Sequence, residues 1–236
     1  MSKLLIIGAS VLQLPAIIKA KELGHTVAVA DYNPQAIGVP YADVYFNAST
    51  IDEEAITAAA EQFKPDGVMT LATDMPMRSL AVATSRLGLP GISYETAVKA
   101  TDKYEMIKAF KSHNVESPWY FLIRTEEELN TVREQITYPC ILKPTDNSGS
   151  RGVVLVHDEE ELKKGFQYST QEGRSGNVII EEYMTGSEVS VEVMVVDGEV
   201  HVLAVTDKLT TGVPHFVEMG HSQQSQLPEK DLQRIK

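Results

Sequence analysis

The chain has 236 residues, of which 33 are acidic and 21 basic, so its formal net charge is −12. Such a chain lacks the surplus of lysine and arginine that a phosphate backbone attracts, which argues against a nucleic-acid partner. No apolar run approaches the roughly 18 residues of a membrane helix, and the run at residues 4–7 is too short for the core of a signal peptide. We therefore expect a cytoplasmic protein with no membrane partner.

The first part of the chain alternates short aliphatic runs with helical periodicity. Strands are expected at residues 3–7, 26–30, 44–46 and 67–71, and helices at 12–23, 52–63 and 76–87. This βαβα order with short loops predicts a parallel sheet with helices on both faces. The alternation ends near Pro90, and two successive helices are expected at residues 94–100 and 102–113.

The second part has a different pattern. Helices are expected at residues 125–135 and 158–166, and strands at 119–123, 141–143, 153–156, 178–180, 188–196 and 199–205. Thr125 with Glu128 predicts a capping box, and Asp197-Gly198 predicts a hairpin turn. Beyond Thr210 the sequence is loop-rich until a helix begins at Glu229. We expect an α/β domain over residues 1–115 and an α+β domain over residues 116–236.

The single cysteine, Cys140, excludes an internal disulfide framework. It lies in an apolar, strand-like stretch, whereas a reactive thiol needs exposure and positive neighbours. We interpret it as a core residue.

Gly8 to Gln13 follows the first strand, and Asp31 lies about 20 residues further on. A dinucleotide fingerprint has three glycines and an acid in this arrangement, but Ser10 and Gln13 stand in place of the second and third glycines. An NAD-dependent oxidoreductase is therefore only a weak alternative. The segment could equally be a structural turn or part of a site for another substrate.

Small and polar residues follow Lys143 up to Gly152. Glycines and hydroxyl groups let backbone N–H groups approach phosphate oxygens, and Lys143 and Arg151 add positive charge. The loop is no Walker A motif, because no Gly-Lys-Ser/Thr closes it, and alone it could be a plain surface loop. The hydroxyl-bearing residues are Thr145, Ser148 and Ser150.

Acidic residues mark the next two strands. Glu181 and Glu182 end a buried strand, where a strand edge could meet an adenine ring, or they could simply be solvated. Glu188 opens the following strand and could hold ribose hydroxyls or lie on the polar face of a sheet. Lys103 lies at the head of a helix that either Thr101 or Asp102 could cap.

In this order and spacing the motifs resemble the ATP-grasp superfamily over nearly the whole chain. Within it the chain looks most similar to the carbamoyl-phosphate synthetase large subunit and to formate-dependent glycinamide ribonucleotide transformylase. The resemblance implies a Rossmann-like pre-ATP-grasp domain over residues 1–115 and an incomplete α+β ATP-grasp fold over residues 116–236. The latter would comprise a lid subdomain over about 116–184 and the start of the larger nucleotide subdomain over 185–236.

The resemblance also implies a role for each motif. Lys103 and Lys143 would contact the nucleotide phosphates, beneath a mobile lid that includes Ser148, Gly149, Ser150 and Gly152. The base would contact the Glu181 side chain and the backbone of Glu182 and Met184, beside Tyr183. The ribose hydroxyls would contact Glu188. The residues expected near the reacting groups are Lys143 and Arg151. Lys208 and His215 lie downstream, where related proteins carry polar residues facing the phosphates or acceptor, and ordinary surface placement is the alternative for both.

The resemblance implies ATP and Mg²⁺ as cofactors. The family's Mg²⁺ ligands, two acids and an asparagine on late strands, have no counterpart before Lys236, so we expect them beyond it. We therefore expect this chain to be a fragment that binds nucleotide without turnover.

The implied activity is an ATP-dependent ligase that phosphorylates a carboxylate to an acyl phosphate, which an amine-type acceptor then attacks. A non-catalytic nucleotide-binding or regulatory module is the alternative. We expect the acceptor near residues 8–13 and Thr73-Asp74, at the carboxyl ends of strands. The partners expected are a small-molecule carboxylate, the acceptor and a second copy in a homodimer.

Overall fold

The computed structural model describes residues 1–214 and 216–235, so His215 and Lys236 lie outside the described residues. The chain divides into two compact units, Met1–His113 and Asn114–Lys236. The boundary falls two residues before the one expected from the sequence. The fold is mixed α/β, with one parallel and two antiparallel sheets, as the sequence predicts.

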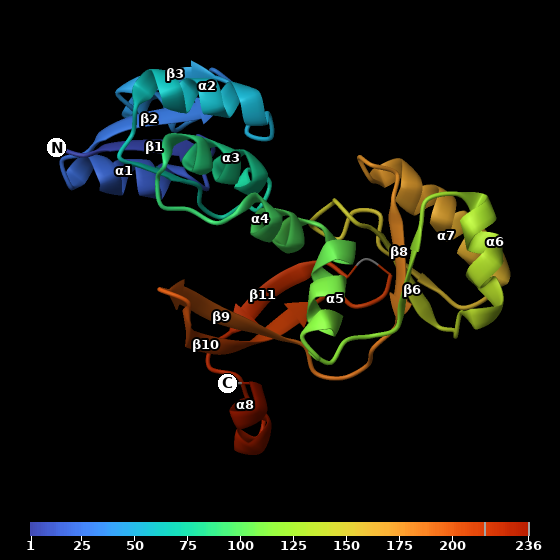
Figure 1. Ribbon diagram of the computed structural model, residues 1–236. Helices are drawn as coiled ribbons and strands as arrows, with labels where there is room; N and C mark the ends of the chain where they lie inside the picture. The colour runs from blue at the N-terminus through green and yellow to red at the C-terminus, as the bar shows by residue number, and fades with distance from the viewer. Residues whose placement is uncertain (215, 236) are drawn as a thin grey trace. The chain divides into compact units, whose positions relative to one another are not determined.

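The first unit is built on a four-stranded parallel sheet in the order β3-β2-β1-β4 (Figure 1). Its strands are β1 (Lys3–Ile7), β2 (Thr26–Asp31), β3 (Val44–Asn47) and β4 (Gly67–Met69). β4 is two residues shorter than expected, because Thr70 turns its hydroxyl to the Ile7 carbonyl, at 2.9 Å, as the chain leaves the sheet.

Helices cover both faces of this sheet, as the βαβα pattern predicts. The helices of the unit are α1 (Leu14–Glu22), α2 (Glu53–Phe63), α3 (Met77–Leu87), α4 (Tyr94–Thr101) and α5 (Lys103–Ser112), with a 3₁₀ turn η1 (Val39–Tyr41). Ile17 of α1 packs with Ile6 on one face. Ile56 of α2 and Leu80 of α3 pack with Leu5 on the other. Alternate residues of β1 thus enter two separate cores.

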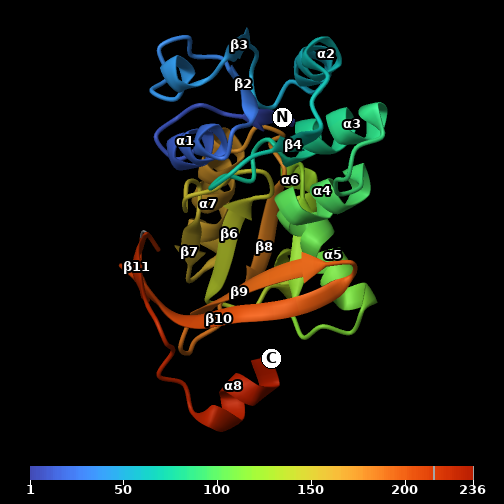
Figure 2. The same cartoon turned by 90° about the vertical axis from the view of Figure 1, so that its left-hand side faces the viewer.

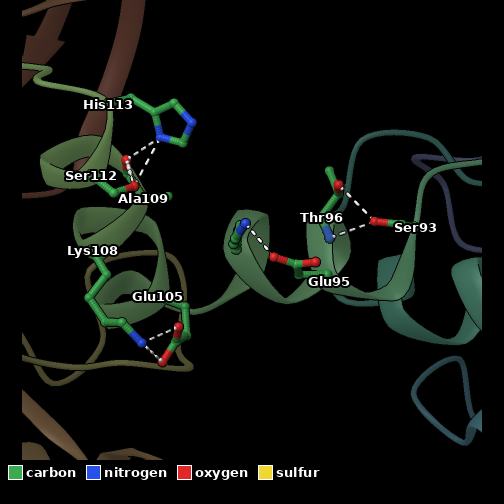
Figure 3. Close-up of polar contacts among 9 residues, drawn as sticks. Ser93, Glu95, Thr96, Glu105, Lys108, Ala109, Ser112 and His113 are labelled. Carbon is green, nitrogen blue, oxygen red and sulfur yellow. Dashed lines mark hydrogen bonds and ion pairs between the residues drawn. The ribbon is translucent and has the colours of Figure 1, made fainter.

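α4 and α5 are short helices with well-formed caps (Figure 3). Ser93 caps α4 by accepting a hydrogen bond from the Thr96 N–H at 3.0 Å. Asp102 both ends α4 and caps α5, because its carboxylate accepts the N–H groups of Tyr104 and Glu105 at 3.0 Å each. Of the two caps predicted as alternatives, Asp102 is confirmed, and it places Lys103 in the first turn of α5.

The second unit contains an antiparallel sheet in the order β5-β8-β6-β7 (Figure 2). Its strands are β5 (Tyr120–Ile123), β6 (Cys140–Pro144), β7 (Val154–Val156) and β8 (Val178–Glu182). Two helices pack on one face of this sheet, α6 (Glu126–Val132) and α7 (Glu159–Glu172). A 3₁₀ turn, η2 (Arg133–Gln135), follows α6. Cys140 and Leu142 point into the resulting core, and both are fully buried.

The capping box predicted at α6 forms only in part. The Thr125 hydroxyl accepts the Glu128 N–H at 3.2 Å, as expected. The Glu128 carboxylate, however, accepts the N–H of Arg124 at 2.7 Å, one residue before the cap. α7 has an Asp158 cap and continues six residues beyond the predicted end.

A three-stranded antiparallel sheet, in the order β11-β10-β9, completes the second unit. It comprises β9 (Val189–Val196), β10 (Glu199–Thr210) and β11 (Glu218–Ser222), and α8 (Glu229–Ile235) follows. The Asp197-Gly198 hairpin turn is confirmed, but β10 is five residues longer than predicted. β11 was not predicted, because residues 218–222 show no apolar alternation. None of the described helices is long and apolar enough to cross a membrane.

Candidate functional site

The site begins at a charge pair on two neighbouring strands. Lys143 of β6 pairs in register with Ile179 of β8, and Glu181 lies two residues further along β8. The two charged side chains therefore share the sheet face opposite Cys140 and Leu142, and they form a short ion pair. Both side chains are largely buried, so the pair compensates charges that would otherwise be costly to desolvate.

The loop between β6 and β7 has a left-handed backbone at Gly149 and Gly152, with φ of 66° and 77°, and at Ser150, with φ of 57°. A Cβ on Gly152 would lie 2.7 Å from Pro144 Cγ and 2.8 Å from Glu172 Cβ, whereas a Cβ on Gly149 would meet nothing within 4 Å. The loop thus has an open tip and a closed base, and the predicted glycine-rich loop is confirmed as a loop.

Phe216 joins this loop to the end of β8. The Ser150 hydroxyl donates to the Phe216 carbonyl at 2.8 Å. The ring of Phe216 meets that of Tyr183 edge-on, with centroids 6.3 Å apart. Sequence reasoning did not single out Phe216, because nothing in its local pattern signals contacts with residues so distant in the chain.

The remaining loop residues differ in accessibility. Arg151 is exposed, and its Nε donates to the Ser148 carbonyl at 3.3 Å, so its charge stays at the loop surface. Thr145 was expected to offer its hydroxyl to a ligand, and this stays a prediction. Its side chain is buried, and its hydroxyl has no hydrogen-bond partner among the described residues.

The end of β8 turns outward after Glu181. Glu182 and Met184 are exposed, while Tyr183 is half-buried. The Glu182 N–H donates to the Trp119 carbonyl at 3.1 Å. That bond extends the pairing of β8 with β5 and holds the strand end in place.

A second charged cluster lies on the β9–β11 sheet. The Lys208 ammonium is 2.6 Å from a Glu188 oxygen and 3.8 Å from a Glu218 oxygen. His221 Nε2 lies 3.8 Å from the other Glu218 oxygen and 3.1 Å from the Ser190 hydroxyl. Glu188 and Lys208, both expected at the site, are thus brought together, and His221 is an addition that sequence reasoning missed.

The candidates of the first unit have structural partners. The Asp31 carboxylate is buried and accepts the N–H groups of Ala9 and Asn33, at 2.8 and 2.9 Å. Because both oxygens are used inside the fold, Asp31 is not placed to bind a ribose, which removes the main support for the NAD alternative. Lys103 lies in the first unit, and its joint action with Lys143 stays a prediction.

The chemistry of these residues suits a polyphosphate better than a metal ion. Lys143, the Ser148 and Ser150 hydroxyls and the glycine-bearing loop are groups that bind phosphate oxygens. The described residues bring together no group of three or more His, Cys, Asp or Glu side chains that could hold a metal ion. The Mg²⁺ ligands expected beyond Lys236 stay a prediction.

Comparison with known proteins identifies the class. Residues 136–236 match the sequence model of the ATP-grasp domain. This stretch includes β6, the glycine-bearing loop, the end of β8 and the Glu188–Lys208 cluster. Residues 136–236 are therefore similar to the ATP-grasp domain, and the resemblance inferred from the motifs is confirmed.

Particular relatives follow. Alanine–anticapsin ligase of Bacillus subtilis is 31% identical over 204 residues, which cover 77% of this chain and 43% of that protein. Formate-dependent phosphoribosylglycinamide formyltransferase of Wolinella succinogenes is 28% identical over 77% of this chain and 48% of its own length. The N-terminal section of the carbamoyl phosphate synthase large chain of Methanopyrus kandleri is 29% identical over 74% of this chain and 33% of its own length. The chain spans about half the length of the curated relatives it matches.

A solved structure is similar over almost the whole chain. Phosphoribosylglycinamide synthetase from Anaerococcus prevotii superposes with a TM-score of 0.74 and 27% identity, covering 99% of this chain and 58% of that one. The predicted α/β fold class is confirmed by this likeness.

Proposed function

We propose that this chain contributes the nucleotide-binding part of an ATP-dependent ligase. The ligase would phosphorylate a small-molecule carboxylate to an acyl phosphate and join it to an amine-type acceptor. Relatives named as ligases and the ATP-grasp domain match support this proposal. The cytoplasmic location and the homodimer expected from the sequence stay predictions.

One observation carries the proposal. Apart from Lys103, the residues expected to surround ATP come from separate segments of the second unit, and contacts connect them in three groups. Lys143 meets Glu181 across β6 and β8, while Ser150 and Tyr183 both contact Phe216. Glu188 meets Lys208 across β9 and β10.

Each group has a physical role in this proposal. Lys143 and Arg151 would offset the charge of the phosphates, and the Ser148 hydroxyl and the N–H groups of the loop would donate to their oxygens. The Glu181 side chain and the backbone of Glu182 and Met184 would hold the base. Glu188 would accept the ribose hydroxyls, with Lys208 orienting its carboxylate. Closure of the loop would exclude water from a reactive acyl phosphate.

Titration calorimetry with ATP tests the binding step. We expect Lys143→Met to weaken ATP binding at least tenfold, because it removes a charge that contacts phosphate. Lys164→Met is the matched control, since Lys164 is an exposed lysine of α7 that pairs with Glu160 in the same helix. Thermal unfolding of both variants establishes that they are folded. Equal ATP affinity in the two folded variants would contradict the proposal.

A coupled assay for ADP separates the ligase from its alternative. ADP release that requires both a carboxylic acid and an amine supports the ligase. ATP binding with no such release from a protein that includes the complete ATP-grasp domain would instead favour a nucleotide-binding or regulatory module.

A further inference from the structure

The loops at the carboxyl edge of the first sheet direct their polar side chains inward. Asp31 bonds the N–H groups of Ala9 and Asn33, and Gln13 Nε2 donates to the Leu71 carbonyl at 2.5 Å. Gln13 and Asp31 are both more than nine-tenths buried. Their hydrogen-bonding groups connect the loops after β1, β2 and β4 instead of facing a ligand.

The apolar side chains of the same loops point the other way. Val11 is 65% exposed, Leu12 52% and Tyr32 72%. The Gly38 N–H donates to the Ala9 carbonyl at 2.8 Å, which joins the β2 loop to the β1 loop. We call the exposed set the apolar edge, and its members are Val11, Leu12, Tyr32, Ile37 and Leu71.

The loops that follow the four strands carry no positive charge. The segments that follow the four strands, residues 8–13, 32–43, 48–52 and 70–76, contain no lysine, arginine or histidine. Asp52 and Asp74 follow β3 and β4, whereas Asp43 lies beside Val27 at the start of β2 and pairs with Lys21. Within these loops a phosphorylated ligand would meet no cationic partner, and the carboxylates of Asp52 and Asp74 would repel it. Arg78, in the first turn of α3, donates to the Thr101 hydroxyl.

The strand order makes this edge a natural place for a ligand. Open α/β sheets bind ligands outside the carboxyl ends of their strands, where the strand order reverses. In the order β3-β2-β1-β4 that point lies between β1 and β4, which are followed by the loops of Leu12 and Leu71. Exposed apolar side chains at such a point favour a ligand that covers them.

We propose that the apolar edge binds an apolar, unphosphorylated group of the acceptor substrate. That this ligand is the acceptor rests on the proposed ligase function, whereas its apolar chemistry follows from the residues of the apolar edge. An aliphatic or aromatic side chain fits these surroundings, and a sugar phosphate does not.

Nuclear magnetic resonance of the ¹⁵N-labelled chain tests the proposal with two probes, L-leucine and D-ribose 5-phosphate. We expect leucine to produce saturable shifts at the amides of the apolar edge, while ribose 5-phosphate at the same concentration produces none there. Titration with ATP in a separate sample is followed at amides of the second unit, so a failure of the proposed function is seen independently.

A matched pair of variants locates the binding surface. Leu12→Ser removes an apolar side chain from the apolar edge, and Leu23→Ser removes one of similar exposure at the far end of α1. We expect leucine to bind about tenfold more weakly to Leu12→Ser and with unchanged affinity to Leu23→Ser, because only the first loses apolar contact area.

Three results would overturn the proposal. The first is the absence of saturable leucine shifts at the apolar edge. The second is binding of ribose 5-phosphate there at least as tightly as leucine. The third is a shift of the same amides on dilution without any probe, which would show that a second copy of the chain covers the edge.

Discussion

The strands β1 and β2 of the first unit and β9 of the second are all rich in aliphatic residues but have very different surroundings. Every residue from Leu5 to Ile7 and from Val27 to Ala30 is fully buried between helices. In β9, the side chains of Val191, Val193 and Val195 are exposed, the last by 61%. Strand composition alone therefore says little about stability, and the layers that cover a strand decide how much each side chain contributes.

The largest effect should separate these two sheets directly. Ile6→Ala should lower the free energy of unfolding by about 4 kcal/mol, because it leaves a cavity in a closed core. Val195→Ala should lower it by less than about 0.5 kcal/mol, because its methyl groups already face solvent. Urea denaturation followed by circular dichroism measures both values. Similar losses for the two variants would show that β9 is covered in solution.

The same contrast recurs within one loop. Gly152→Ala should cost about 3 kcal/mol, because the new Cβ would combine a left-handed backbone with clashes against Pro144 and Glu172. Gly149→Ala should cost about 1 kcal/mol, from its backbone conformation alone. Thermal unfolding measures the loss of stability in both variants. A larger loss for Gly149→Ala would show that the crowded end of the loop lies at Gly149 and not at Gly152.

A smaller effect follows from the buried thiol. Burial raises the pKa of Cys140 from an ordinary value of 9.0 to about 11. Between these pH values the thiol ionises in the unfolded chain but stays neutral in the folded one. Unfolding therefore releases a proton, and stability falls as pH rises through this window.

Tyrosines also ionise near this pH, so comparison with Cys140→Val is needed to isolate the contribution of the thiol to stability. At pH 10 the wild type should have lost about 1 kcal/mol of stability relative to pH 8 that the variant retains. Denaturant midpoints at the two pH values provide the measurement. Parallel losses in both proteins would show that Cys140 is not shielded from solvent.

The smallest stability effect is expected on the open sheet. Glu188→Gln breaks the ion pair with Lys208, but Glu188 is more than half exposed, so the loss should stay below about 0.5 kcal/mol. The same change should weaken ATP binding several-fold if Glu188 holds the ribose. A large loss of stability would instead make the pair a structural one.

Much of the architecture could be predicted from local patterns. The alternation of aliphatic runs and helical periodicity predicts the first sheet and its helices, and Asp52, Asp102, Thr125 and Asp158 all cap the helices that they precede. The Asp197-Gly198 turn likewise needs only its neighbours. These signals are local because caps and tight turns satisfy backbone groups within a few residues.

The parts that could not be predicted depend on distant partners. β11 is a strand only because it pairs with β10, and residues 218–222 have no strand pattern of their own. The motif order identified Ser150 and Tyr183 as site residues, but their shared contact with Phe216 arises only in the folded chain. The inward turn of Asp31, which separates this protein from a dinucleotide binder, depends in the same way on Ala9.

The open side of β9 has a practical consequence for handling the protein. Within the described residues β9 pairs only with β10, so its other side offers backbone donors and acceptors beside four consecutive apolar residues, Val193 to Val196. Such an unpaired strand edge favours aggregation through intermolecular sheets in concentrated samples. Val193→Lys should reduce this aggregation, because the added charge opposes pairing between copies, and it leaves the residues assigned to the nucleotide unchanged.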